Sequence, residues 1–188
     1  MRFSLFILAM CCFFRSTAHA QQLITDRSRS NFVYELPTEK GKKVFISQGY
    51  NGWFSHKKQF ALDFKLKEGS PIYAARDGLV YKCVSHNTEG GMNKKYLSKG
   101  NYIIIQHEDG TYAAYWHLQY NGVIVKKGEQ VITGQQIGFS GNTGYSTSPH
   151  LHFEVYFYND EGRQVTFPTQ FKTSKGVEGI KVYKFYSR

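Results

Sequence analysis

Cysteine is scarce in this sequence, with three in 188 residues. Two of them, Cys11 and Cys12, lie in the first apolar run, so removal of that segment would leave Cys83 alone and exclude an intrachain disulfide. Long apolar runs are missing as well, because the run at residues 3–14 is too short to span a membrane. We therefore expect no membrane span once this segment is removed.

The first twenty residues, MRFSLFILAMCCFFRSTAHA, have the three parts of a secretory signal peptide. Arg2 supplies a positive start, residues 3–14 an apolar core, and residues 18–20 a small-x-small cleavage pattern. A buried or membrane-anchoring N-terminal segment is the alternative. We expect residues 1–20 to be removed and the protein to be exported, either into the periplasm or out of the cell.

Acidic residues are also few, since 14 Asp and Glu stand against 24 Lys and Arg, a formal net charge of +10. Removal of residues 1–20 takes away Arg2 and Arg15 and leaves a formal charge of +8. A basic surface favours an anionic partner, such as a cell-wall polymer or a nucleic acid. No nucleic-acid-binding motif accompanies the charge, so we expect the wall polymer and no nucleic acid.

Helical periodicity is weak, and short β-branched and aromatic runs alternate with Gly, Asn and Asp. This pattern predicts an all-β fold, a small domain built on an antiparallel β-sheet. The domain should cover residues 43–167, between a short lead-in at 21–42 and a basic tail at 168–188 that either packs as an edge strand or frays. Strands are expected at residues 43–47, 60–64, 71–74, 78–83, 102–107, 111–118, 136–140, 152–157 and 165–167.

Two histidines flank Leu151 in the run HLHFEVYF. Residues two apart in a strand project from the same face, so His150 and His152 should point the same way. Two neighbouring imidazoles need polar partners, and a metal site would supply them. Two exposed histidines on a surface strand are the alternative. His117, which ends the run YAAYWH, is by itself more typical of a hydrogen-bonded structural residue.

Asp63 is an acid inside the apolar run ALDF, and a buried carboxylate needs a cation, a hydrogen-bond network or a metal. A salt bridge is the ordinary explanation. If His56, Asp63 and His152 bind one ion, they form a two-histidine, one-carboxylate zinc set with an open position for water. Zinc lowers the pKa of such a water toward about 7. The motif H-E-x-x-H is missing, which excludes the common helix-borne zinc peptidase site.

Four segments together resemble the lysostaphin/LytM-type zinc peptidase family. They are GSPIYAARDGLVY, NYIIIQHEDGTYAAYWHL, GQQIGFSGNTGYSTSPHLHFEV and the stretch from His56 to Asp63, in the family's order. The resemblance implies a small antiparallel β domain of the duplicated-hybrid-motif kind, with a substrate groove and one Zn²⁺ ion. It also implies cleavage of peptide bonds in bacterial peptidoglycan. We expect the protein to act as a monomer.

By this resemblance, His56, Asp63 and His152 are the metal ligands. His117 and His150 match the family's two histidines that do not bind the metal, and these activate the attacking water and stabilise the oxyanion. An inactive module of the same fold, which binds or regulates another wall hydrolase, is the alternative. Loss of a ligand or of a catalytic histidine would mark that class.

The spacing between His56 and Asp63 departs from the family pattern, because six residues separate them and the family has three. The family spacing would place the first ligand at Gln59, whose amide oxygen binds zinc poorly compared with imidazole. Loss of the first ligand is one explanation. We expect instead that a bulge of three residues before the strand brings His56 to the metal.

The turn-rich loop SGNTGYSTSP at residues 140–149 lies next to the H-x-H motif. We expect it to form one wall of the groove, with Asn142 and Ser146 contacting the substrate; a plain connector is the alternative. Tyr50 shortly precedes His56. It is expected to line the groove and to help at the oxyanion, although packing in the core would also explain it.

Overall fold

The computed structural model describes residues 32–188, so the predicted signal peptide and part of the lead-in lie outside it. Within this range the regular structure is almost all strand, apart from the short 3-10 helix η1 (Lys94–Tyr96). The strands are β1 (Val33–Glu35), β2 (Val44–Gln48), β3 (Ala61–Lys65), β4 (Pro71–Tyr73), β5 (Gly78–Val84), β6 (Asn101–Gln106), β7 (Tyr112–Val123), β8 (Gln130–Val131), β9 (Gln136–Ser140), β10 (His150–Tyr158), β11 (Gln164–Thr166), β12 (Gln170–Thr173), β13 (Gly176–Gly179) and β14 (Phe185–Tyr186).

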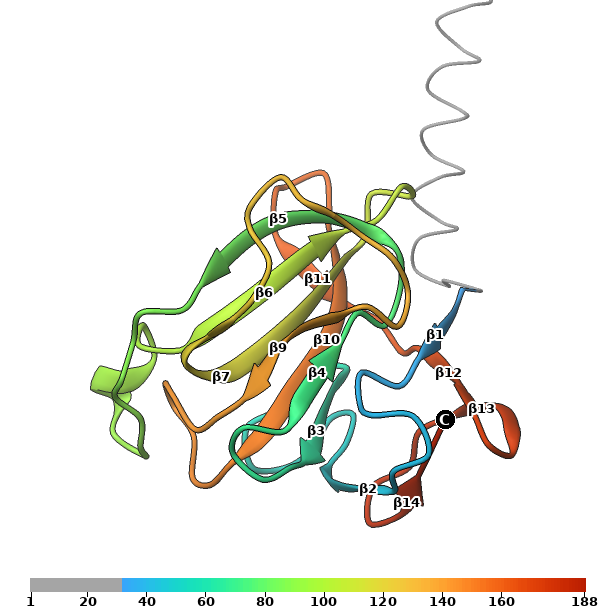
Figure 1. The fold of residues 1–188 in the computed structure, drawn as a ribbon, viewed down its shortest axis with the longest axis horizontal. Helices are drawn as coiled ribbons and strands as arrows, with labels where there is room; N and C mark the ends of the chain where they lie inside the picture. The colour runs from blue at the N-terminus through green and yellow to red at the C-terminus, as the bar shows by residue number, and fades with distance from the viewer. Residues whose placement is uncertain (1–31) are drawn as a thin grey trace, which may run out of the picture.

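Most strands join one 11-stranded sheet whose main path is β14-β2-β3-β10-β7-β6-β5-β8. β11 pairs with β10, and β9 pairs with β4 and β7, always antiparallel. A small second sheet has the order β1-β12-β13, with β1 parallel to β12. Figure 1 shows this small sheet at one side of the molecule, close to β2 and β14. The predicted all-β, mainly antiparallel fold is confirmed.

Each of the nine expected strands has a counterpart, with ends shifted by a few residues. β10 starts at His150, two residues before its expected start, so both histidines of the H-x-H motif belong to the strand. Five further strands are present beyond these nine: β1, β8, β12, β13 and β14, of which β14 is the edge strand left open for the tail. They are two to four residues long, which is too short to show an alternating pattern.

The lead-in and the tail pack into the same core as the central strands. Leu36 of the lead-in and Phe171 of the tail are both fully buried in it. Burial of such a side chain stabilises a fold by roughly 1.5–3 kcal/mol. At the end of the tail, β14 pairs with β2 as the edge strand of the main sheet. Residues 168–188 therefore contribute to the stability of the whole domain.

The alternation of β10 separates the core from a second, functional face of the sheet. Leu151 and Phe153 are buried in the core, whereas His150 and His152 project from the opposite face. On the neighbouring strand β3, Asp63 lies directly opposite His152. Directly opposite residues share a face, so the register of this strand pair brings the carboxylate to the histidines.

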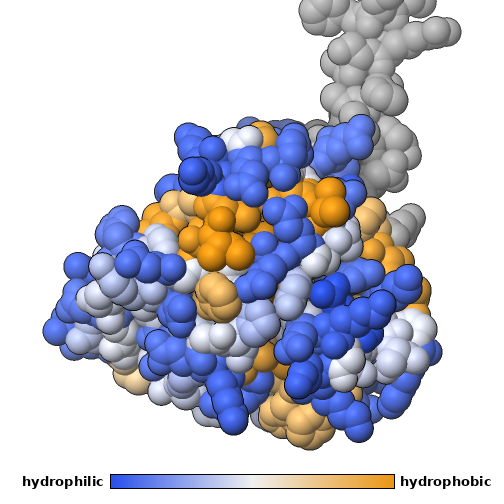
Figure 2. Space-filling model, in the orientation of Figure 1, coloured by the Kyte–Doolittle hydropathy of each residue, from blue (hydrophilic) through white to orange (hydrophobic). Residues whose placement is uncertain are grey.

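Hydrophilic residues cover most of the molecular face drawn in Figure 2, and apolar residues gather in a patch in its upper half. This distribution agrees with the mean hydropathy of −0.45 for the chain. Residues 32–188 form no helix with the length and apolar character needed to cross a membrane.

Candidate metal centre

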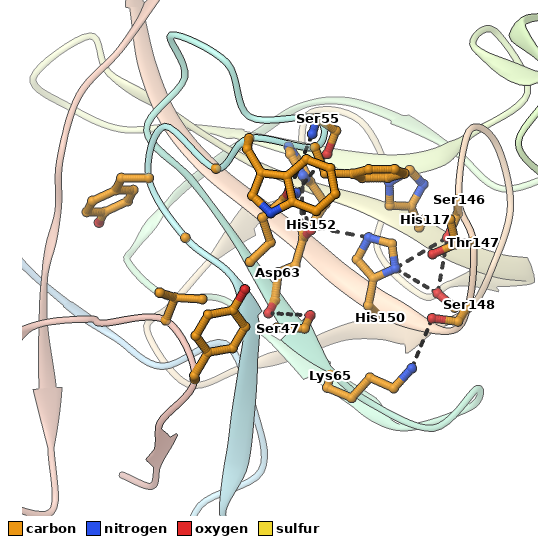
Figure 3. Close-up of a pocket in the computed structure, with 18 of the residues that line it drawn as sticks. Ser47, Ser55, Asp63, Lys65, His117, Ser146, Thr147, Ser148, His150 and His152 are labelled. Carbon is orange, nitrogen blue, oxygen red and sulfur yellow. Dashed lines mark hydrogen bonds and ion pairs between the residues drawn. The ribbon is translucent and has the colours of Figure 1, made fainter.

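A groove of about 790 Å³ lies over the functional face of the main sheet. Three segments supply its walls: residues 47–55, residues 145–148 and residues 180–183. In Figure 3, Asp63 and the histidines of β10 lie at its base, and the loop with Ser146, Thr147 and Ser148 stands beside His150. The expected groove is therefore present, with the 140–149 loop as one wall.

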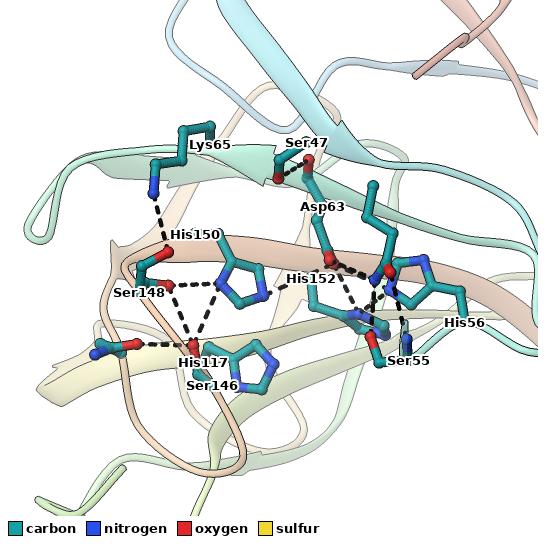
Figure 4. A network of polar contacts seen from close by, with 12 residues as sticks. Ser47, Ser55, His56, Asp63, Lys65, His117, Ser146, Ser148, His150 and His152 are labelled. Carbon is teal, nitrogen blue, oxygen red and sulfur yellow. Dashed lines mark hydrogen bonds and ion pairs between the residues drawn. The ribbon is translucent and has the colours of Figure 1, made fainter. Parts of the chain in front are cut away.

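Three side chains place one donor atom each at the same point of this groove (Figure 4). His56 Nε2 lies 3.2 Å from Asp63 Oδ1 and 3.1 Å from His152 Nδ1. Asp63 Oδ1 and His152 Nδ1 are 3.0 Å apart. Among residues 32–188, no other three His, Cys, Asp or Glu side chains converge in this way. The structure thus brings together the three residues expected to bind metal.

The chemistry and size of this cluster fit a zinc ion. Zn²⁺ binds imidazole nitrogen and carboxylate oxygen at about 2.0–2.2 Å in a tetrahedron, which places ligand atoms about 3.3–3.5 Å apart. The three separations in the cluster lie within a few tenths of an ångström of that spacing. Two imidazoles and one carboxylate also match a catalytic zinc set that leaves a fourth position open.

His56 reaches the cluster through a turn in the loop before β3. Gln59 N donates to His56 O over 3.0 Å, and Lys58 adopts a left-handed φ of 61° within the turn. The turn accommodates the longer spacing and directs the imidazole inward, where His56 is fully buried. Gln59, at the family spacing, is exposed. It is therefore His56 that approaches Asp63.

A backbone carbonyl fixes the orientation of the His56 ring. His56 Nδ1 donates to Gly49 O over 3.0 Å, so the neutral ring presents the lone pair of Nε2 to the cluster. Gly49 also packs against the C-terminal segment, since a Cβ built on it would lie 3.3 Å from Val182 Cβ. One residue thus connects a candidate ligand to the tail.

A second contact joins the same loop to the tail. Tyr50 Oη lies 2.8 Å from Thr169 Oγ1 and accepts a hydrogen bond from Thr169 N at 3.0 Å. Because the tyrosine is one residue after Gly49, the C-terminal segment braces the loop at two adjacent positions. Tyr50 lines the groove, but its hydroxyl is engaged by Thr169. Its expected role at the oxyanion stays a prediction.

Asp63 is held as a carboxylate by its neighbours. Burial acts to raise its pKa, but hydrogen bonds with His152 and His56 outweigh burial and hold the pKa well below the usual range. Its second oxygen, Oδ2, accepts a hydrogen bond from Gln48 Nε2 at 3.0 Å. Gln48 was not foreseen, because it lies opposite Asp63 only through a register shift in β2.

Two further histidines of the groove are oriented by carbonyl groups. His150 Nδ1 donates to Ser148 O over 2.7 Å, and His117 Nδ1 donates to Thr143 O over 2.8 Å. Each neutral ring therefore carries its lone pair on Nε2. His150 Nε2 lies 3.7 Å from Asp63 Oδ1, and the His117 ring centroid is 4.7 Å from that of His150. Both can accept a proton beside the cluster.

Burial keeps these two rings neutral. It is the main cause that lowers the pKa of His117 to about 3, and the charges of His150 and His152 act in the same direction. Burial also lowers the pKa of His150, although the charge of Asp63 opposes it. The charge of Asp63 favours the protonated form of both rings, but it is a minor effect for His117 and the main effect that opposes burial for His150.

His117 enters the groove because it occupies a β-bulge. Asn101 pairs with Leu118 and Tyr102 pairs with Trp116, which leaves His117 as the extra residue of β7. Its φ of 65° is unusual for a residue other than glycine and costs on the order of 1–3 kcal/mol. The bulge interrupts the strand alternation and turns the imidazole toward His150, which the spacing of YAAYWHL could not show.

Asn142 and Ser146, the other expected substrate contacts, bond to each other. Ser146 Oγ donates to Asn142 Oδ1 over 2.7 Å and lies 3.3 Å from His150 Nδ1. Ser146 lines the groove, and Asn142 is not among the lining residues. In the structure these two residues organise the loop next to His150, and direct contact with a substrate stays a prediction.

Residues 57–166 match the family described as Peptidase family M23. The chain is 41% identical over 93 residues to the peptidoglycan DD-endopeptidase ShyA of Vibrio cholerae, which covers 50% of this chain and 19% of that protein. It is 33% identical over 117 residues to the glycyl-glycine endopeptidase ALE-1 of Staphylococcus capitis, which covers 62% of this chain and 30% of that protein. The chain thus spans less than a third of either relative.

Solved structures agree with this match. A zinc-containing peptidase from Vibrio cholerae superposes with a TM-score of 0.51 at 30% identity, covering 72% of this chain and 39% of that one. The catalytic domain of the prophage-encoded M23 protein EnpA from Enterococcus faecalis gives a TM-score of 0.51 at 25% identity, covering 68% of this chain and 92% of that one. The resemblance noted in the sequence is confirmed at the level of the family.

Proposed function

Because the chain belongs to peptidase family M23, we propose that it is a zinc-dependent endopeptidase that hydrolyses peptide bonds in bacterial peptidoglycan. One observation carries the proposal: a cluster of three donor atoms lies beside two imidazoles whose free nitrogens accept protons. Relatives that are named peptidoglycan DD-endopeptidase or glycyl-glycine endopeptidase support the substrate class.

His56, Asp63 and His152 would hold the ion. When bound, zinc lowers the pKa of a water molecule and polarises a carbonyl group. The chain then has to hold these ligands in position, accept a proton from the attacking water and deliver one to the leaving nitrogen. The Gly49 carbonyl and the Gln48 amide serve the first task, since each fixes one ligand.

His150 is our candidate for the proton transfers. Its Nε2 carries the lone pair, because Nδ1 donates to Ser148 O, and lies 3.7 Å from Asp63 Oδ1, so it can accept a proton beside the cluster. The resulting imidazolium can donate that proton to the leaving amine. His117, with the more strongly depressed pKa, stays neutral and accepts a hydrogen bond that orients the water or the substrate.

Export belongs to the same proposal, since peptidoglycan lies outside the cytoplasm. The sequence of residues 1–20 supports a cleaved signal peptide, and the formal charge of +8 on the remainder favours an anionic wall polymer. We propose a periplasmic or secreted enzyme. N-terminal sequencing of the protein recovered outside the cytoplasm should begin near residue 21, and an intact Met1 there would contradict cleavage.

Digestion of purified peptidoglycan tests the activity. The protein should release peptide-containing fragments with zinc present, a chelator should stop the release, and added zinc should restore it, as measured by mass analysis of the products. Failure to release fragments at any zinc concentration would contradict the enzyme and favour a module that regulates another wall hydrolase. The masses also identify the bond that is cut.

A further inference from the structure

A row of side chains leads from the catalytic histidines to the edge of the sheet. His150 lies opposite Lys65 on β3, Lys65 lies opposite Phe45 on β2, and Phe45 lies opposite Phe185 on β14. Directly opposite residues share one face of a sheet, so all four belong to the face that carries the groove. A substrate that extends from His150 in this direction meets first a lysine and then aromatic rings.

The C-terminal segment builds the far end of this row. The rings of Phe45 and Phe185 are 5.1 Å apart, and Tyr183 packs 6.5 Å from Phe45. Phe185 is 63% exposed and Tyr183 is 68% exposed, so the rings form an open apolar shelf. Tyr183 holds a left-handed φ of 60°, and its amide donates to Ile46 O over 2.9 Å. The backbone thus fixes an exposed aromatic residue at the rim of the groove.

Two lysines give the lining of the groove positive charge, Lys65 on β3 and Lys181 in the wall of residues 180–183. Lys65 and Lys181 both line the groove, and Asp63 is the single acidic residue among its lining. Lys65 Nζ donates to a neutral group, Ser148 Oγ, over 2.9 Å (Figure 3). Within residues 32–188, a lysine forms an ion pair only at Lys99, far along the chain from this wall. Two free cations beside an apolar shelf suit a ligand that combines an aliphatic stem with a carboxylate.

We propose that Lys65 and Lys181, together with the shelf of Phe45, Tyr183 and Phe185, form a carboxylate-binding subsite at the edge of the groove. Tyr183 lines the groove, and Phe45 and Phe185 continue the shelf outside it. The subsite selects peptides with an acidic group on an aliphatic stem next to the bond that is cut. This inference rests on the proposed peptidase function and names its substrate class. Apart from Lys65, these residues lie outside the span 57–166 that matches the family, so the subsite is a feature of this chain's flanking segments.

The test compares two peptidoglycan stem peptides that differ in one group, a free side-chain carboxylate or its amide. Binding to metal-free protein is measured by calorimetry, so the readout does not need turnover. We expect the carboxylate peptide to bind more tightly. Lys181→Glu should weaken its binding about fivefold to tenfold, because the lysine is exposed, and should leave the amide peptide unchanged. Lys65→Met should act in the same direction.

The matched control is Lys175→Glu, which makes the same charge change in the turn between β12 and β13. It should leave both affinities unchanged. Equal binding of the two peptides by the unaltered protein, or an equal effect of Lys175→Glu and Lys181→Glu, would overturn the subsite. Carboxylate preference without hydrolysis at any zinc concentration would instead contradict the peptidase and leave the subsite standing. Hydrolysis by a protein that does not prefer the carboxylate peptide would overturn the subsite and leave the peptidase standing.

Discussion

Asp63 and His152 lie opposite each other on paired strands, whereas His56 comes from a loop and has no strand partner. Asp63 and His152, with His150 and His117 beside them, form the sheet half of the site. It is fixed by the hydrogen bonds between strands β3, β10 and β7. The loop half depends on a few contacts: the Gly49 carbonyl, the turn at Lys58 and the brace from Tyr50 to Thr169. The sheet can therefore keep Asp63 and His152 in position when neighbouring residues are substituted. The position of His56 depends instead on the contacts of its loop.

Removal of the loop ligand is expected to have the largest effect. His56→Ala should lose bound zinc and all detectable peptidoglycan hydrolysis, because two protein ligands do not retain a catalytic zinc ion. The matched control Gln59→Ala should keep both. Zinc content is measured by mass spectrometry of the purified proteins. Metal loss in Gln59→Ala with retention in His56→Ala would show that Gln59, at the family spacing, is the ligand in place of His56.

Changes in the sheet half should separate catalysis from metal binding. His150→Gln and His117→Gln should each lower the rate of hydrolysis by about 10²–10⁴-fold, the usual contribution of a general acid–base residue, with zinc content unchanged. His86→Gln, in the long loop before β6, serves as the control and should leave the rate unchanged. A rate within threefold of the unaltered enzyme in either groove variant would remove that histidine from the mechanism.

Acid stability should depend in part on a buried histidine outside the groove. His107 is buried at the end of β6, donates from Nδ1 to Asp77 O, and has no partner for Nε2 among the described residues. Burial lowers its pKa from 6.5 to about 4, so the unfolded chain binds a proton in this window and the folded chain does not. The free energy of unfolding should therefore fall as pH drops from about 6.5 to 4, by up to about 3 kcal/mol.

Urea unfolding at several pH values measures this loss. His107→Gln removes the titration and keeps a donor for the Asp77 carbonyl, so its stability should depend less on pH across the same window. A pH dependence identical to that of the unaltered protein would show that other groups cause the acid sensitivity.

The smallest expected effect concerns the brace of the loop half. Tyr50→Phe removes the hydroxyl that bonds Thr169 and should cost about 1 kcal/mol of stability. Because that hydroxyl holds the loop of His56, zinc affinity should fall by up to about tenfold, as is usual when a residue that positions a metal ligand is substituted. Tyr120→Phe, an exposed tyrosine on β7, is the control. Unchanged zinc affinity in Tyr50→Phe would show that the loop holds its shape without the tail.

The sequence allowed the sheet half of the site to be predicted better than the loop half. Alternation in HLH places His150 and His152 on one face, and the pairing of β10 with β3 then brings Asp63 to the same face. The bulges at His117 and near Gln48 could not be foreseen, because a register shift depends on the partner strand and leaves no local pattern. The backbone carbonyl groups that orient the histidines could not be foreseen either, since any residue type supplies a carbonyl group.

The tail shows a different limit of sequence analysis. Its strands β12, β13 and β14 are short. The pairing of β12 with β1 and of β14 with β2 joins segments more than a hundred residues apart. Local patterns do not encode such distant pairings. The tail therefore read as either an edge strand or a frayed end, although Phe171 is buried in the core and residues 180–183 form a wall of the groove.

The contact between Tyr50 and Thr169 also has a consequence for the order in which the protein is made. Synthesis proceeds from the N-terminus, so His56, Asp63 and His152 all exist before the residues that brace the His56 loop. A nascent chain that ends before Thr169 would have its three ligands but neither of the contacts that brace the loop. The loop of His56 is thus braced only after all three ligands have been made, and the site is complete only when residues 169–182 have packed against the loop.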